Sequence, residues 1–278
     1  MRDTRVVDGV ERYLSVVKAE WPERNVGNLR FYLDYLFDGV PLAGRRVLDV
    51  GAGDGVYSFY LAAAGAERVV ALEPESAGST AGVTGSFSRL RDALGLDSVD
   101  LRTETLQDFD PGDERFDVLF LHAAINHLDE SATIALGRDE AARQTYRSLF
   151  SKLASIGAPG AKLVAADASP HNLFGRLGLR NPLQPTIEWE KHQTPETWAR
   201  LLEDAGFGDP RIRWNSINTL RRPGRVLLGN RVAAWFLDST FCLTMTLRDP
   251  HQLGGPTGRA TRRFRRRPRR GARNSSRA

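Results

Sequence analysis

The sequence predicts an α/β fold in which a mainly parallel sheet carries helices on both faces. Residues 46–50 (RVLDV) indicate a short buried strand. A turn with three glycines in five positions, 51–55, follows, and the apolar run 56–64 has the character of a helix. A second apolar strand, 68–72, then ends at Glu73. Strand, tight turn, helix and strand together form the first unit of a parallel sheet.

The remaining elements follow from apolar alternation and helical spacing. Two helices precede the sheet, at 6–20 and 27–37. Within the sheet domain we predict helices at 84–94, 138–154, 195–205 and 230–237, and strands at 99–103, 116–121, 161–166, 211–214 and 239–247. The last two strands are expected to form a hairpin that ends the fold, with the helix between them as an elaboration.

Composition divides the chain into three parts. Residues 1–45 form an N-terminal helical cap, and residues 46–250 form the sheet domain. An irregular insertion at about 168–194, broken by prolines, interrupts that domain after its fifth strand and is placed to cover a ligand. Residues 251–278 hold ten arginines and no acid, with Leu253 and Phe264 as the only large apolar residues, so this tail is expected to be disordered.

The glycine turn and the acid after it predict a binding site. Glycine permits backbone angles that are closed to other residues and allows a ligand to lie against the main chain. Asp49 can hydrogen-bond the turn or accept from a cationic amine. Glu73 stands roughly twenty residues past the turn at a strand tip, where a carboxylate can accept hydrogen bonds from both hydroxyls of a ribose.

The motif VLDVGAGDG followed by VVALEPE resembles the S-adenosylmethionine-dependent methyltransferases of class I, the Rossmann-like class. The turn departs from the dinucleotide fingerprint, because Val56 and Tyr57 follow Gly55, and no Lys-Ser/Thr pair closes it as in a phosphate-binding loop. The resemblance covers about residues 46–167. It implies a Rossmann-like seven-stranded sheet and S-adenosylmethionine as the cofactor, and it leaves the acceptor open.

The resemblance also implies which residues bind the cofactor. Related enzymes often have an acid after the third strand that holds the adenine amino group; Thr105 stands near that position, Asp108 lies further along, and the backbone of Leu106 is an alternative. The N-terminal helices either form a lid over the cofactor or pack on the sheet edge. The predicted cofactor-binding set is Asp49, Gly51, Ala52, Gly53, Gly55, Glu73, Pro74, Thr105, Leu106 and His122.

Methyl transfer to a hydroxyl requires alignment of the reacting atoms and removal of a proton, for which histidine is the natural base near neutral pH. His127 and His122 lie at the mouth of the strand 116–121 and are the catalytic candidates. His171 and His192, in the cover insertion, are further candidates. A structural role for His127 and a cofactor contact for His122 remain open at this stage.

A metal site is not predicted. His122 and His127 are five residues apart, and not the four that place two imidazoles on one helix face. Asp167 could add a carboxylate at a neighbouring strand tip, but no tight carboxylate cluster accompanies it.

The residues after the fourth strand bear on the acceptor. Leu121-His122-Ala123-Ala124 stands where enzymes that methylate amino groups of nucleobases or amides have an Asn-Pro-Pro-Tyr-type tetrad. This favours O-methylation of a small molecule or glycan. Two alternatives stay open: a non-catalytic cofactor-binding regulatory or assembly protein, and an RNA-directed methyltransferase recruited by its basic tail.

Charge and cysteine content indicate the compartment. The net charge of +5 comes from the tail, because residues 1–250 hold 29 basic and 34 acidic side chains. The tail could contact nucleic acid or an anionic membrane electrostatically, or simply aid solubility. The single Cys242 suits the core of a protein in a reducing cytoplasm. No secretory signal or run of about 18 apolar residues is present, so we expect a cytoplasmic protein.

Overall fold

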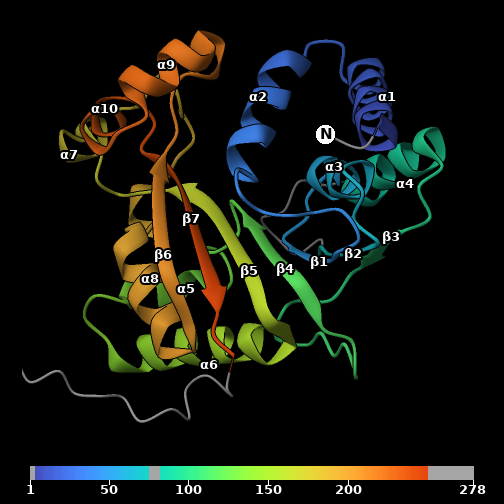
Figure 1. Cartoon of the computed structure of the whole chain (residues 1–278). Helices are drawn as coiled ribbons and strands as arrows, with labels where there is room; N and C mark the ends of the chain where they lie inside the picture. Colours follow the sequence, from blue (N-terminus) through green and yellow to red (C-terminus); the bar gives the residue numbers. More distant parts are fainter. Residues whose placement is uncertain (1–3, 75–81, 250–278) are drawn as a thin grey trace, which may run out of the picture.

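A computed structural model describes residues 4–74 and 82–249. Its centre is a seven-stranded sheet with the order β3-β2-β1-β4-β5-β7-β6 (Figure 1). Neighbours among β1 to β5 run parallel, and β7 lies antiparallel between β5 and β6. The strands are β1 (Arg46–Val50), β2 (Arg68–Leu72), β3 (Val99–Arg102), β4 (Phe116–His122), β5 (Gly157–Ala168), β6 (Phe207–Trp214) and β7 (Thr240–Leu247). The predicted Rossmann-like seven-stranded sheet with a final antiparallel pair is confirmed.

Helices cover both faces of the sheet. The described helices are α1 (Thr4–Glu20), α2 (Val26–Leu36), α3 (Val56–Ala63), α4 (Val83–Leu94), α5 (Glu130–Ala135), α6 (Glu140–Ile156), α7 (Leu173–Arg176), α8 (Pro195–Asp204), α9 (Arg221–Leu228) and α10 (Arg231–Phe236), with 3-10 turns at Trp189–Lys191 and Asn218–Leu220. Two apolar clusters fill the space between layers. One holds Trp198, Tyr146 and Phe150 from α8 and α6, and the other holds Tyr13 and Phe59 from α1 and α3.

Two strands begin earlier than predicted. β5 starts directly after α6, at Gly157, where the sequence indicated a turn; Gly157 pairs with Phe116 before an irregularity in the register. β6 starts at Phe207, where the glycines suggested only the end of a helix. Gly206 takes a left-handed φ of 102° and ends that turn, and the fully buried Phe207 enters the core at once. The short helices α5, α7 and α9 were not predicted, because few residues in each carry a helical pattern.

The two N-terminal helices, for which the sequence left a lid and a packing role open, have different positions. α1 packs on α3, where the Tyr13 hydroxyl donates to the Val56 carbonyl oxygen at 2.7 Å. α2 reaches the ends of the strands, where Tyr32 Oη lies 3.1 Å from His122 Nε2. Its Tyr35 hydroxyl also donates to the carbonyl oxygen of Arg213 in β6 at 2.9 Å. α1 is therefore part of a helical layer, and α2 borders the site.

Three further predictions concern Cys242, the C-terminal tail and membrane-spanning helices. Cys242 is fully buried in the apolar cluster, as a core residue would be. The predicted tail 251–278 lies outside the described residues. Within 4–74 and 82–249, no helix is both long and apolar enough to cross a membrane.

Candidate functional site

The glycine turn between β1 and α3 leaves room for a ligand at one position. Gly51, Gly53 and Gly55 all have a left-handed φ, of 74°, 54° and 79°. A Cβ at Gly51 would lie 2.7 Å from the Ala124 Cβ, and one at Gly55 would lie 2.4 Å from the Phe87 ring. A Cβ at Gly53 would meet nothing within 4 Å. Gly51 and Gly55 therefore allow close packing of the turn, whereas Gly53 faces open space.

Two buried carboxylates lie beneath this turn. Glu73 Oε2 accepts a hydrogen bond from the Gly53 backbone N–H at 2.8 Å, so the acid at the tip of β2 and the open glycine are adjacent. Asp49 Oδ2 accepts from the Ser58 hydroxyl at 2.6 Å. Burial raises the pKa of Asp49 to about 7, and the hydrogen bond from Ser58 opposes that rise. The ionisation of Asp49 is thus coupled to folding near neutral pH.

We expect Asp49→Asn to make thermal unfolding less dependent on pH. Because the folded pKa of Asp49 is raised, stability from its neutral carboxyl is present at acidic pH and is lost as the pH rises from about 4 to about 7. Asparagine cannot ionise, so the melting temperature of the variant should rise relative to the wild type across this interval. Calorimetry over that pH range measures this, with exposed Asp97→Asn as the control. Equal pH profiles for Asp49→Asn and the wild type would contradict the prediction.

The predicted adenine contacts lie on a turn after β3. The Thr105 hydroxyl donates to Asp108 Oδ2 at 2.7 Å and accepts from the Asp108 N–H at 3.2 Å. The Thr105 hydroxyl therefore uses its donor and an acceptor position within the turn itself. Leu106 is buried beside it, and its backbone stays the predicted contact. Ala52 is buried within the glycine turn, and Pro74 is the last residue described before the gap at 75–81.

His122 ends β4 inside an aromatic group. Its ring lies 4.2 Å from the Tyr57 ring, and its Nε2 is 3.1 Å from Tyr32 Oη. Burial lowers the pKa of His122 to about 4, although Asp167 and Asp54 act in the opposite direction. An imidazole with so low a pKa is neutral and weakly basic at pH 7. This environment suits His122 to a packing contact with the cofactor better than to the role of general base.

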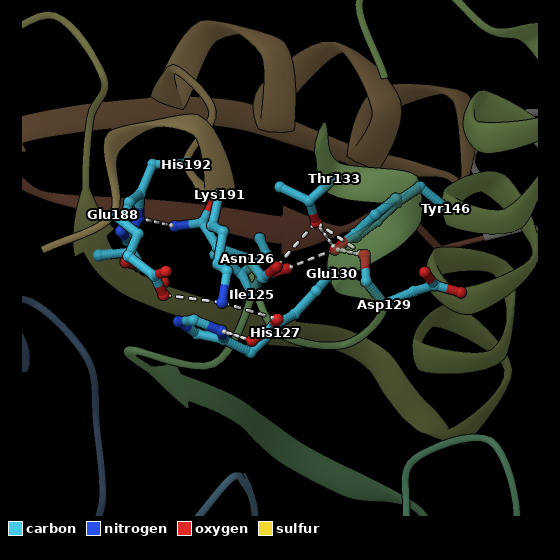
Figure 2. A network of polar contacts seen from close by, with 11 residues as sticks. Ile125, Asn126, His127, Asp129, Glu130, Thr133, Tyr146, Glu188, Lys191 and His192 are labelled. Atoms are coloured by element: carbon cyan, nitrogen blue, oxygen red, sulfur yellow. Dashed lines mark hydrogen bonds and ion pairs between the residues drawn. The ribbon is translucent and has the colours of Figure 1, made fainter. Parts of the chain in front are cut away.

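His127 lies on the turn that follows β4, in a partly exposed position. Its Nδ1 is 2.9 Å from Glu130 Oε1 (Figure 2). That distance identifies Nδ1 as the donor to the carboxylate, which leaves Nε2 as the free nitrogen. His127 borders a cavity of about 610 Å³, which Tyr32, Tyr57 and His122 also line. Both candidate catalytic histidines thus face one cavity.

Buried polar contacts hold the turn that carries His127. The Thr133 hydroxyl donates to the Asn126 carbonyl oxygen at 2.7 Å, and the Tyr146 hydroxyl donates to the carbonyl oxygen of Ile125 at 3.0 Å (Figure 2). Asp129 caps α5 by accepting from the Ala132 N–H. Just before the turn, Ala123 adopts a φ of 49°, a strained value for a residue with a side chain. The position of His127 therefore depends on contacts from α5 and α6.

The insertion after β5 also lines the cavity. Lys191 Nζ lies 3.1 Å from Glu130 Oε2 and 2.7 Å from Glu188 Oε2 (Figure 2). Hydrogen bonds from His127 and then Lys191 lower the pKa of Glu130, so this carboxylate is ionised at neutral pH. Glu188 and Lys191 line the cavity, as do Leu183 and Gln184 from the same insertion.

Hydrogen bonds orient the ring of His192. The backbone N–H of Gln193 donates to Asn126 Oδ1 at 3.0 Å, which turns Asn126 Nδ2 toward His192 Nδ1 at 2.9 Å. The amide nitrogen can only donate, so Nδ1 accepts and Nε2 carries the proton. Asp167 Oδ1, at the end of β5, lies 3.4 Å from the same Nδ1. His192 thus offers a hydrogen-bond donor at the wall of the cavity.

The other candidates are dispersed. His171 is exposed and lines a separate cavity of about 330 Å³ with Trp214 and Trp235. Among the described residues, no group of three or more His, Cys, Asp and Glu side chains could hold a metal ion. Sequence reasoning missed Glu130, Lys191 and Asn126. The three-residue spacing of His127 and Glu130 was a usable signal, whereas the contacts of Lys191 and Asn126 join segments more than 60 residues apart.

Comparisons with known proteins identify the family. Residues 21–209 match the family described as "Methyltransferase domain". A ubiquinone biosynthesis O-methyltransferase of Methylobacterium sp. (strain 4-46) is 30% identical over 167 residues, covering 60% of this chain and 61% of that protein, so the chain spans about three-fifths of this relative. The same enzyme of Hahella chejuensis is 28% identical over 207 residues, with 72% and 77% covered.

Two further matches extend the comparison. A tRNA U34 carboxymethyltransferase of Marinobacter nauticus is 28% identical over 207 residues, covering 67% of this chain and 60% of that protein. A crystal structure of a protein from Listeria monocytogenes, titled as an S-adenosylmethionine-dependent methyltransferase, shares the fold with a TM-score of 0.55, 12% identity, and 81% and 100% of the two chains covered. From the family match and the glycine turn with its acid, the chain belongs to the methyltransferase-domain family and is a class I enzyme that uses S-adenosylmethionine.

Proposed function

We propose that the enzyme methylates a hydroxyl oxygen of a small molecule or glycan, with His127 as the general base. One observation carries this proposal: an imidazole on the wall of the cavity is oriented by Glu130 through Nδ1 at 2.9 Å, and its Nε2 is free. In many enzymes a general base that activates the nucleophile is itself oriented by a third side chain, as Glu130 orients His127 here. His122 is the weaker candidate because burial lowers its pKa to about 4.

The chain's own residues fit the cofactor. The open space beside Gly53 lets a ligand approach the main chain, and the buried Glu73 carboxylate, already fixed by the Gly53 N–H, suits the ribose hydroxyls. Asp49 of β1 accepts a hydrogen bond from Ser58 of α3 and so joins the two elements that flank this turn. Tyr57, which follows this turn at the start of α3, lines the cavity together with His122. When bound, S-adenosylmethionine supplies an electrophilic methyl group.

Removal of the acceptor proton follows from the network around His127. The hydroxyl donates to Nε2 of His127, which takes the proton as the oxygen attacks. Glu130 accepts from Nδ1 and stabilises the imidazolium that results. Lys191 keeps Glu130 ionised and in place, at 3.1 Å. His192 donates from Nε2 and can orient a second oxygen of the acceptor, while its own Nδ1 is occupied by Asn126.

Several relatives support oxygen as the acceptor atom. Those from Methylobacterium, Hahella and Ruegeria are named ubiquinone biosynthesis O-methyltransferases. Residues 121–124 lack the tetrad expected of nucleobase or amide N-methylation. A cavity of about 610 Å³ is of the size that encloses a drug-sized molecule.

The acceptor class is tested by incubating the full-length protein with isotope-labelled S-adenosylmethionine and a panel of phenols, catechols, sugars and amines. We expect S-adenosylhomocysteine release that depends on a hydroxylated acceptor, with the label recovered as a methoxy group by NMR. Label on nitrogen or carbon would overturn O-methylation while leaving methyltransferase activity intact.

The RNA-directed alternative is supported by the Marinobacter relative and by the basic tail. Total tRNA as acceptor tests it in the same assay. Activity with tRNA but with none of the small molecules, lost on truncation after Asp249, would replace our proposal with this alternative.

A further inference from the structure

Exposed apolar side chains concentrate in two segments of the chain. The structure describes eleven large apolar residues as exposed, and nine of them lie between 177 and 236. Only Val7 and Ile134 lie elsewhere. The nine are Leu177, Leu179, Leu183, Ile217, Leu220, Val226, Leu227, Val232 and Phe236, and we call the surface they form the apical surface. The helix α10 contacts both α7 and α9, and exposed apolar groups gathered on neighbouring elements mark an interaction site.

The topology places the apical surface at the edge of the sheet where the acceptor cavity lies. α7 follows the end of β5, and α9 and α10 lie between the end of β6 and the start of β7. β5 and β6 are each antiparallel to β7, so both end at the same edge. In Figure 1 these three helices gather at that end of the sheet. Leu183 belongs to both features, because it is 51% exposed and lines the cavity.

Two arginines of α9 face the protein, and two of its aliphatic residues face outward. Its Arg221 guanidinium donates to the Gly27 carbonyl oxygen, and Arg225 donates to the carbonyl oxygen of Phe31 at 3.1 Å, with its charge 3.9 Å from the Phe31 ring centre. Val226 and Leu227 are 82% and 71% exposed. A surface helix of a globular protein normally buries its apolar stripe and exposes its charges. Val226 and Leu227 of α9 are therefore left largely without apolar cover among the described residues.

The two segments that carry the apical surface contain basic side chains and no acidic ones. No acid occurs from 169 to 187 or from 215 to 237. Arg176, Arg180 and Arg222 are exposed within these segments, and Arg231 is exposed while pairing with Glu196 at 3.2 Å. Trp214 and Trp235 line a cavity with Arg231 between β6 and α10. Apolar side chains within a cationic, tryptophan-containing surround are the composition of a protein face that lies in a membrane interface.

We infer that the apical surface docks on an anionic phospholipid bilayer and presents the acceptor cavity to it. The absence of acids over two long segments makes an anionic partner electrostatically complementary. The chain's own tail is a poor occupant, because its ten arginines would be repelled by the same charge. This inference concerns binding, so it stands whether or not the acceptor is a hydroxyl.

The test is sedimentation of the full-length protein with vesicles of phosphatidylcholine, with and without phosphatidylglycerol. We expect binding to the anionic vesicles, weakened roughly ten- to a hundredfold when Val226→Ser and Leu227→Ser are combined, because two inserting aliphatic side chains are lost. Arg222→Gln should weaken binding roughly fivefold. The matched control combines Val7→Ser and Ile134→Ser, which removes the two exposed apolar side chains outside the surface and should leave binding unchanged. Every variant keeps the tail, so any contribution of the tail cancels.

Three results would overturn the inference. Equal vesicle binding by the wild type and the Val226/Leu227 variant would show that the surface does not insert. Equal binding to vesicles with and without phosphatidylglycerol would remove the role of charge. Light scattering that shows a dimer for the wild type and a monomer for the Val226/Leu227 variant, without vesicle binding by either, would assign the surface to a second copy of the chain.

Discussion

Gly53→Val is expected to abolish S-adenosylmethionine binding. At Gly53 an added Cβ meets no protein atom within 4 Å, so the side chain would project into the space where the ligand approaches the main chain. The same backbone N–H donates to Glu73 at 2.8 Å, so displacement of the turn would also misplace the carboxylate. We expect calorimetry to show at least about a hundredfold weaker binding, which corresponds to about 2.7 kcal/mol.

The control for this variant is Gly112→Val. Gly112 also has a left-handed φ, of 59°, and open space around its Cβ, but it lies on the loop before β4. The two substitutions therefore impose similar backbone strain, and only the one at Gly53 enters the proposed site. Wild-type affinity in Gly53→Val, or an equal loss in Gly112→Val, would contradict the assignment of the turn to the cofactor.

His127→Ala is expected to lower turnover by roughly 10²–10⁴-fold, the usual contribution of a general base, without a change in cofactor affinity. Glu130→Gln removes the charge that stabilises the imidazolium and should lower turnover by a smaller factor. The two effects should not add in the double variant, because Glu130 acts only through His127. Turnover is measured with saturating cofactor, and cofactor affinity is measured separately by calorimetry.

His171→Ala is the control, because His171 is an exposed histidine that lines a different cavity. Its turnover should match the wild type. A near-wild-type rate for His127→Ala, with a lower melting temperature, would make His127 a structural residue. The base would then have to be sought at another group on the cavity wall, or the acceptor would need none.

The order of elements could be predicted from the sequence because it depends on local patterns. The apolar strands 46–50 and 68–72, the glycines between them and the acid after the second strand all lie within about 30 residues, and their periodicity identifies them. The errors fell where the local pattern was short or ambiguous. β5 and β6 each begin within glycine-containing stretches, where pairing with a neighbouring strand decided the conformation.

The choice between His122 and His127 needed the tertiary structure. In the sequence both follow the same strand, five residues apart. Tyr32 from α2 and Tyr57 from α3 pack against His122, and this burial lowers the pKa of His122 to about 4. His127 lies on a turn that leaves it partly exposed beside Glu130. Burial is a property of the assembled fold, so no local pattern could separate the two.

By itself the sequence determined the class of fold, the glycine turn and the acid after the second strand, because each is recorded in neighbouring residues. Only the tertiary structure decided how the acceptor side is built. Lys191 and His192 reach Glu130 and Asn126 across about 60 residues of chain. In α9, Arg221 and Arg225 face α2, whereas Val226 and Leu227 face solvent. Such contacts depend on which surfaces meet after folding, and a helical pattern gives the spacing of an apolar stripe but not the direction in which it faces.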